Sequence, residues 1–126
     1  DILKPLALEQ GRNLHAETSV QGGYYFRSDH FNFAKAGVPA LYAKGGNDLL
    51  EGGSPAGDAA EADYRDHRYH KPGDQYEPGW KLDGVLEDLN ALYMVGNTVA
   101  NDAGWPNWLA TSAFRATRDR MMAAKK

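Results

Sequence analysis

The stretch from Leu82 to Asn101 repeats apolar residues with the period of an α-helix. The apolar positions of this stretch are Leu82, Val85, Leu86, Leu89, Leu92, Tyr93, Gly96, Val99 and Ala100. At about 1.5 Å per residue such a helix is roughly 30 Å long. An apolar face of this length must be covered by another layer of structure, so the stretch predicts a helix that packs on a larger surface.

The rest of the chain offers few strands for that surface. Val38–Ala43 is a continuous apolar run that predicts a buried strand, and residues 13–20 suggest a second short strand. The predicted fold class is therefore α/β, with short strands and a long C-terminal amphipathic helix. Because so few strands do not build a sheet, residues 1–126 are predicted to form an incomplete domain that needs more chain or a partner.

Shorter helices are predicted near the amino terminus. Residues 2–10 place apolar side chains on one helical face, and Gly11 is suited to end that helix. A second short helix is predicted after Ser28 and Asp29, either of which can cap it, with Gly37 at its end.

Glycine and charge mark the less regular parts of the chain. Residues 45–57 are rich in glycine and predict a surface loop, and residues 58–69 predict a polar helix or irregular structure. The basic stretch from Arg115 onward is predicted to be a frayed tail.

Composition excludes several function classes. The net charge of −3 is too small to indicate a nucleic-acid partner, and no apolar run is long enough to span a membrane. The chain has no cysteine, which excludes disulfides and thiolate metal ligands within it.

Two groups of residues are candidates for chemistry. His70 lies just before a Pro-Gly turn, and imidazole is the commonest protein metal ligand. His67 lies three residues earlier, a spacing at which two helical histidines can share a metal, although no third ligand is suitably spaced. Ser28, Asp29 and His30 suggest a catalytic triad, but adjacent side chains point in different directions and do not form one.

Two separated stretches resemble the zinc-dependent aminopeptidase family, which includes bacterial leucyl aminopeptidases, glutamate carboxypeptidase II and glutaminyl cyclases. The first stretch is YYFRSDHFNFAKAGVPALY, residues 24–42. The second is RYHKPGDQYEPGW, residues 68–80, followed by the long predicted helix. The resemblance implies that the chain is the C-terminal part of the α/β/α sandwich of a di-zinc exopeptidase that acts on peptides.

The resemblance also implies roles for individual residues. His70 matches the last ligand of a two-zinc centre, and Ser28 matches a residue that orients this imidazole by a hydrogen bond. Tyr25 matches a tyrosine that contacts the substrate carbonyl in aminopeptidases, and Tyr69 matches one with a similar role in carboxypeptidases. Either hydroxyl is suited to stabilise a tetrahedral oxyanion, and only one of them need do so.

The chain departs from the family where most of the zinc ligands are expected. It contains no His-x-Asp motif and no Glu-Glu pair, so the bridging aspartate and the glutamate general base are absent. The implied zinc site therefore needs the remainder of the peptidase domain, and the chain alone is expected to be inactive. We also expect an isolated chain to self-associate, and the close look-alikes suggest a periplasmic or secreted protein. The alternative is a non-catalytic binding or dimerisation module of the same fold.

Overall fold

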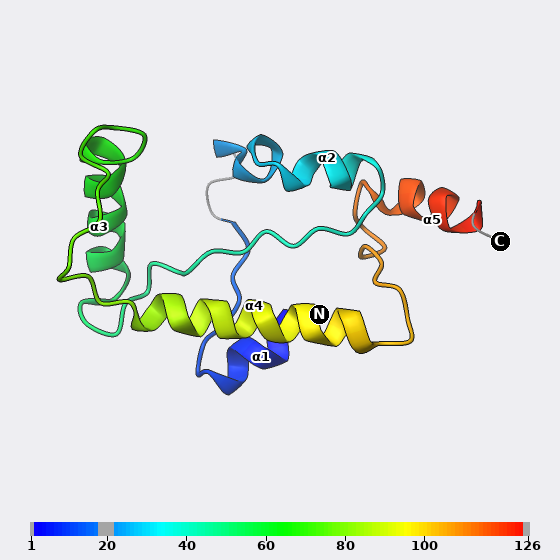
Figure 1. The fold of residues 1–126 in the computed structure, drawn as a ribbon, viewed down its shortest axis with the longest axis horizontal. Coiled ribbons are helices and arrows are strands. Elements are labelled where there is room, and N and C mark those ends of the chain that lie inside the picture. The colour runs from blue at the N-terminus through cyan, green and yellow to red at the C-terminus, as the bar shows by residue number, and fades with distance from the viewer. Residues whose placement is uncertain (1, 18–21, 125–126) are drawn as a thin grey trace. The chain divides into compact units, whose positions relative to one another are not determined.

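The computed structural model describes residues 2–17 and 22–124, and these residues form helices joined by irregular segments (Figure 1). The elements, in chain order, are α1 (Leu3–Glu9), the 3₁₀ helix η2 (Tyr24–Arg27), α2 (His30–Lys35), α3 (Gly53–His67), α4 (Asp83–Asn101) and α5 (Arg115–Ala123).

The predicted α/β class is wrong for this structure, which is 51% helix and 1% strand and has no sheet among its described residues. Val38–Ala43 has no regular structure, and neither do residues 13–17. Residues 18–20 of the second predicted strand lie outside the described residues. An apolar run becomes a strand only when a neighbour pairs with its backbone groups, and Val38–Ala43 has no such neighbour in the described part of the chain.

Glycine ends the first two α-helices as the sequence predicts. The amides of Gly11 and Arg12 donate to carbonyl oxygens in the last turn of α1, at 2.9 Å and 2.8 Å. Gly37 and Val38 end α2 with the same pair of bonds, at 2.9 Å and 3.0 Å. The φ angles are +71° at Gly11 and +89° at Gly37, a left-handed conformation that glycine adopts at little cost.

The chain divides into two compact units, and the first consists of residues 1–43 with residues 91–126. Its buried residues, among those described, are Ala7, Ala34, Gly37, Ala91 and Arg118. α1 and the part of α4 from Ala91 onward both belong to this unit. No large apolar side chain is buried among the described residues of this unit, so the unit has no large hydrophobic core.

The second unit, residues 44–90, is built on α3. The helix begins at Gly53, so the predicted loop over residues 45–57 extends too far. Gly57 faces the backbone of Asn47 so closely that an added Cβ would lie 1.9 Å from its carbonyl oxygen. The Asn47 side chain donates to Asp58 at 2.9 Å and also to Glu61, which fixes the loop against the helix.

The helix predicted over residues 82–101 is confirmed as α4, which has an acidic residue, Asp83, in its first turn. Most of its apolar face is exposed, with 58% of the residue surface accessible at Leu89 and 62% at Leu86. None of the described helices has the combination of length and apolar character that crossing a membrane requires.

The C-terminal stretch is helical, contrary to the prediction of a frayed tail. Arg115 and Asp119 form an ion pair at 3.0 Å across one turn of α5. The hydroxyl of Ser112 accepts a hydrogen bond from the amide of Phe114, at 3.3 Å, just before the helix. These local interactions support a helix where the composition suggested only a basic tail.

Candidate functional site

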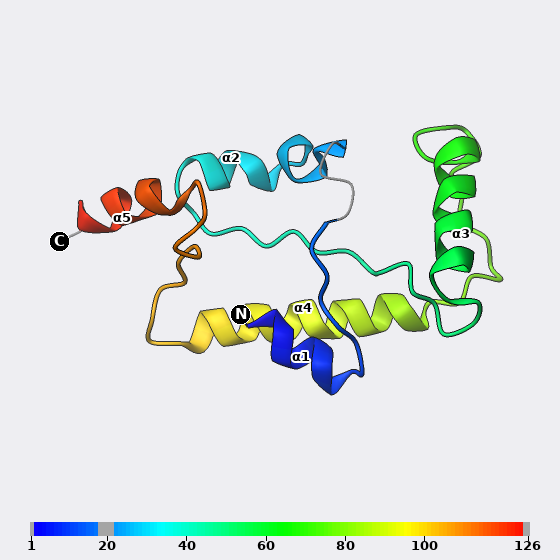
Figure 2. The same cartoon turned by 180° about the vertical axis from the view of Figure 1, so that it is seen from behind.

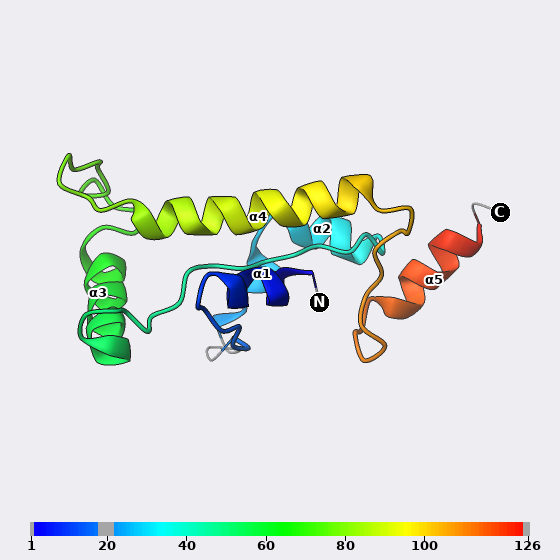
Figure 3. The ribbon, with the colours of Figure 1, turned by 90° about the horizontal axis from the view of Figure 1, so that it is seen from below.

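His70 lies three residues beyond the end of α3, in the unit of residues 44–90. Figure 3 shows α3. The helix ends where the amides of Arg68 and Tyr69 both donate to the carbonyl oxygen of Tyr64, each at 2.8 Å. His70 then adopts a φ angle of +56°, and no other non-glycine residue among those described has a positive φ. This conformation costs an ordinary residue about 1–2 kcal/mol, and such outliers gather at functional sites.

Hydrogen bonds hold this turn in place. The amide of Asp74 donates to the carbonyl oxygen of Lys71 at 3.0 Å, and the hydroxyl of Tyr64 donates to the Asp74 carboxylate at 3.0 Å. The second bond is the main reason why the pKa of Tyr64 is raised. The ring of Tyr69 stacks on the imidazole of His70, with centroids 4.0 Å apart. His70 is exposed, so its imidazole is oriented by the turn and the stacked ring while remaining open to a ligand.

His67 does not pair with His70 in the way that helical spacing suggests. His67 is the last residue of α3, whereas His70 lies beyond the helix in the left-handed conformation. Nδ1 of His67 instead contacts the Asp63 carboxylate at 3.0 Å, one helical turn back. The prediction of a helical histidine pair is therefore wrong, because the helix ends between the two residues.

The chain by itself does not provide a zinc site. Among the described residues no group of three or more histidine, cysteine, aspartate or glutamate side chains is placed to hold a metal ion. Catalytic zinc needs about three protein ligands and a water. His70 is suited to supply one zinc ligand, and the described residues do not provide the other ligands of a catalytic zinc site.

Ser28 lies between η2 and α2 in the other unit. Its hydroxyl donates to the carbonyl oxygen of Tyr24 at 3.1 Å. The amino-terminal capping residue of α2 is Asp29, and its side chain makes no capping hydrogen bond. The predicted capping role of Ser28 or Asp29 is wrong, because the Ser28 hydroxyl closes the preceding 3₁₀ turn instead. The predicted pairing of Ser28 with His70 joins residues of different units and stays a prediction.

Tyr25 lies at the centre of an aromatic cluster in the same unit as Ser28. The centroid of its ring is 4.4 Å from that of His30, 6.3 Å from that of Tyr42 and 6.2 Å from that of Phe114. The Tyr25 hydroxyl donates to the carbonyl oxygen of Ala40 at 3.4 Å. Burial raises the pKa of Tyr25.

His30 belongs to this cluster and not to a triad. Its ring stacks on Tyr42, with centroids 4.9 Å apart, and meets Tyr25 edge-on. The Nε2 atom of His30 is buried and has no hydrogen-bond partner in the structure. No local sequence pattern links Tyr42 or Phe114 to Tyr25, because the three residues come from separate segments of the chain.

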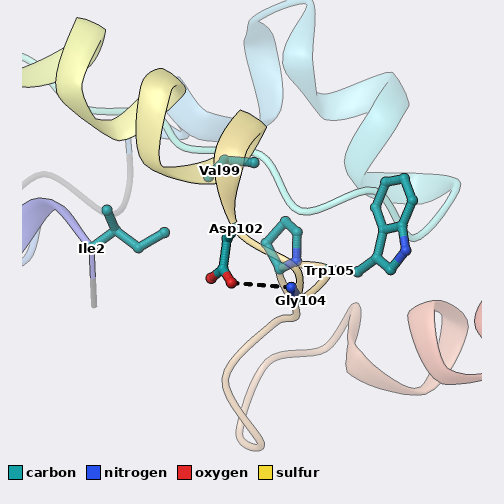
Figure 4. Close-up of a pocket in the computed structure, with 6 residues that line it drawn as sticks. Ile2, Val99, Asp102, Gly104 and Trp105 are labelled. Atoms are coloured by element: carbon teal, nitrogen blue, oxygen red, sulfur yellow. Dashed lines mark hydrogen bonds between the residues drawn. The ribbon is translucent and has the colours of Figure 1, made fainter.

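A small pocket lies elsewhere in the unit that contains Tyr25 (Figure 4). Its volume is about 100 Å³, below the range of roughly 300–1,000 Å³ that is usual for ligand sites. The carboxylate of Asp102 accepts a hydrogen bond from the amide of Gly104 at 3.1 Å, so the one acidic group in the lining is already engaged. The lining residues are Ile2, Val99, Asp102, Gly104, Trp105 and Pro106. None of the predicted site residues is among them.

Comparison with known proteins gives one match. The family model of peptidase family M28 matches residues 1–94. The chain belongs to peptidase family M28. Members of this family are zinc-dependent aminopeptidases and carboxypeptidases, so the intact protein is expected to be a metallopeptidase. No curated protein and no solved structure matches the chain.

The M28 match covers every predicted site residue and stops within α4. Ser28 and Tyr25 fall in its first part, and Tyr69 and His70 fall in its last part. The end of α4 and all of α5 lie beyond the matched residues. The match confirms the resemblance read from the two sequence stretches, while the roles of the individual residues remain predictions.

Proposed function

We propose that this chain is the C-terminal segment of the catalytic domain of a zinc exopeptidase, an aminopeptidase that removes residues from the ends of peptides. The observation that carries the proposal is the position of His70. It falls inside the M28 match, in a left-handed turn braced by Tyr64 and Asp74. A backbone held in this costly conformation presents an exposed imidazole in one orientation, as a metal ligand requires.

The remaining roles are assigned on chemical grounds. His70 supplies one zinc ligand, and Ser28 orients that imidazole in the intact domain. Tyr25 or Tyr69 donates a hydrogen bond to the oxygen of the scissile carbonyl as negative charge develops on it. Zinc, when bound, polarises this carbonyl and activates a water molecule.

The isolated chain is proposed to be inactive. The described residues contain no three-ligand group, and the sequence has neither the His-x-Asp motif nor the Glu-Glu pair of the family. A second zinc ion, the bridging carboxylate and the general base are assigned to the remainder of the peptidase domain. A periplasmic or extracellular location is proposed from the sequence resemblance alone.

The test is to replace His70 and His67 separately by alanine in the intact protein. We expect His70→Ala to remove zinc and most activity towards aminoacyl-nitroanilide substrates. The matched control His67→Ala should change either quantity little, because that imidazole is occupied by Asp63. Metal content and initial rates measure the two effects.

Each other outcome of this test has a definite meaning. A damaging His67→Ala beside a silent His70→Ala would overturn the ligand assignment. An intact protein without zinc or peptidase activity would favour the alternative, a non-catalytic binding or dimerisation module. That alternative takes some support from the lack of a three-ligand group among the described residues.

A further inference from the structure

The segment beyond the M28 match packs directly on the cluster that surrounds Tyr25. The ring of Phe114 lies 6.2 Å from that of Tyr25 and 6.1 Å from that of Phe31, measured between centroids. Trp108 lies behind Phe114, with centroids 5.0 Å apart. Phe114 is more than eighty positions from Tyr25 and Phe31 in the sequence, and Trp108 and Phe114 lie beyond the residues that the family model matches.

The same segment is fastened to the end of α2. The indole N–H of Trp108 donates to the carbonyl oxygen of Gly37 at 3.2 Å. Gly37 is buried, and a Cβ at this position would lie 3.0 Å from the backbone nitrogen of Arg118. Figure 2 shows the start of α5 beside the end of α2. A glycine with a φ of +89° therefore allows the two backbones to approach closely.

Internal hydrogen bonds stiffen the segment that carries Phe114. Arg115 donates from Nη1 to the carbonyl oxygen of Trp108 at 2.9 Å. Arg118, only 4% exposed, donates from Nη2 to the carbonyl oxygen of Pro106 at 2.9 Å. Two guanidinium groups thus fold the 106–118 stretch back on itself. Phe114 caps the start of α5, and its ring contacts Trp108 of this stretch and Tyr25 of the cluster.

We infer that Phe114 positions Tyr25 for its contact with the substrate carbonyl, and that Trp108 fixes Phe114 to the end of α2. The inference rests on the proposed function, because Tyr25 must be the tyrosine that contacts substrate. Phe114 itself touches no substrate and acts through the Tyr25 ring. Its face limits how far that ring can tilt, and a displacement of about 1 Å in a catalytic group can change a rate about 100-fold.

The test is a double-mutant cycle in the zinc-loaded intact protein, using Phe114→Leu and Tyr25→Phe. Tyr25→Phe removes the hydroxyl and should lower kcat about 100-fold, as the loss of an oxyanion donor does. Phe114→Leu should lower kcat about 10-fold and leave KM within about twofold, because only the transition-state contact is disturbed. In the Tyr25→Phe background, Phe114→Leu should change kcat less than about twofold, because the hydroxyl it acts through is gone.

Two further variants keep the test decisive. Trp108→Phe removes the indole donor to Gly37 and should lower kcat in the same direction as Phe114→Leu, with the same dependence on Tyr25. Phe33→Leu is the matched control, since Phe33 is 64% exposed on α2, and it should leave kcat unchanged. Titration of the Tyr25 phenol by ¹³C NMR provides a readout apart from turnover. Phe114→Leu should move its raised pKa back towards the ordinary value.

The outcomes separate the two proposals. If Tyr25→Phe leaves kcat unchanged, the role of Tyr25 in the proposed function is wrong, and Phe114 has no catalytic group to position. If Tyr25→Phe lowers kcat, but Phe114→Leu lowers kcat by the same factor with and without the Tyr25 hydroxyl, only the positioning role of Phe114 is overturned. An unchanged Tyr25 titration in Phe114→Leu would likewise overturn it.

Discussion

Gly57 lies within α3, and its replacement tests whether helix propensity or close backbone packing has the larger effect on the stability of the unit of residues 44–90. Replacing a glycine inside a helix by alanine normally stabilises that helix by about 1 kcal/mol. Gly57→Ala should do the opposite. Its Cβ would lie 1.9 Å from the carbonyl oxygen of Asn47 and 2.7 Å from the carbonyl carbon. These are backbone atoms, so the clash cannot be relieved by rotating a side chain.

The magnitude follows from the size of the displacement. To regain an ordinary contact of 3.4 Å, the Asn47 oxygen must retreat by about 1.5 Å, the difference between 3.4 and 1.9 Å. Overpacking of this kind typically costs about 1–3 kcal/mol. The shift also strains the hydrogen bonds of the Asn47 side chain to Asp58 and Glu61. Set against a propensity gain of about 1 kcal/mol, the packing cost alone leaves a destabilisation of up to about 2 kcal/mol, to which the strained hydrogen bonds add.

Gly96→Ala in α4 is the matched control, since a Cβ at Gly96 meets nothing within 4 Å. It should stabilise its helix by about 1 kcal/mol. Backbone amide hydrogen exchange measures both effects as local opening free energies. We expect faster exchange in α3 for Gly57→Ala and slower exchange in α4 for Gly96→Ala. Equal stabilisation by both variants would show that the loop carrying Asn47 yields freely and that the packing argument is incorrect.

Two other predictions concern the same helices. The pKa of Glu61 is lowered, mainly because Asn47 and then Lys44 donate hydrogen bonds to its carboxylate. The ionised carboxylate therefore stabilises the fold above its ordinary pKa of 4.5, and this stabilisation is lost as the pH falls through the lower pKa of the folded state. Circular dichroism from neutral pH into this acidic range should show a loss of helix that is smaller in Glu61→Gln, and identical profiles would contradict the assignment. We further propose that the isolated chain self-associates through the exposed apolar face of α4. Leu89→Glu should then lower the mass measured by light scattering, and a parent chain that is monomeric at high concentration would refute the proposal.

Local signals predicted the helices well. Gly11 and Gly37 end α1 and α2 with the expected pairs of hydrogen bonds, because a glycine in the left-handed conformation closes a helix wherever the chain leads next. The spacing of the apolar residues in α4 also predicted a helix, because these residues form one apolar face that another surface must cover. Both signals depend on residues within a few positions of one another.

Strand prediction failed because it depends on residues elsewhere. The apolar character of Val38–Ala43 indicates burial, yet a strand also needs a neighbour whose backbone groups are free to pair. The described residues provide no such neighbour, and the segment stays irregular. The opposite error occurred at α5, where a basic composition suggested a frayed tail. The Arg115–Asp119 ion pair and the packing of Phe114 support a helix there.

The two candidate tyrosines show which features of the site can be predicted from the sequence and which cannot. Family motifs identified Tyr25 and Tyr69 but gave no means of choosing between them. The structure gives them different surroundings: Tyr25 is enclosed by His30, Tyr42 and Phe114, whereas Tyr69 is exposed and stacks on the imidazole that it precedes. A hydroxyl that must meet a developing charge gains most from a ring whose position is already fixed, because no reorganisation is then needed as the reaction proceeds. We therefore propose Tyr25 as the oxyanion donor, a role in which its hydroxyl must turn from the carbonyl oxygen of Ala40 to the substrate, and we propose that Tyr69 orients His70.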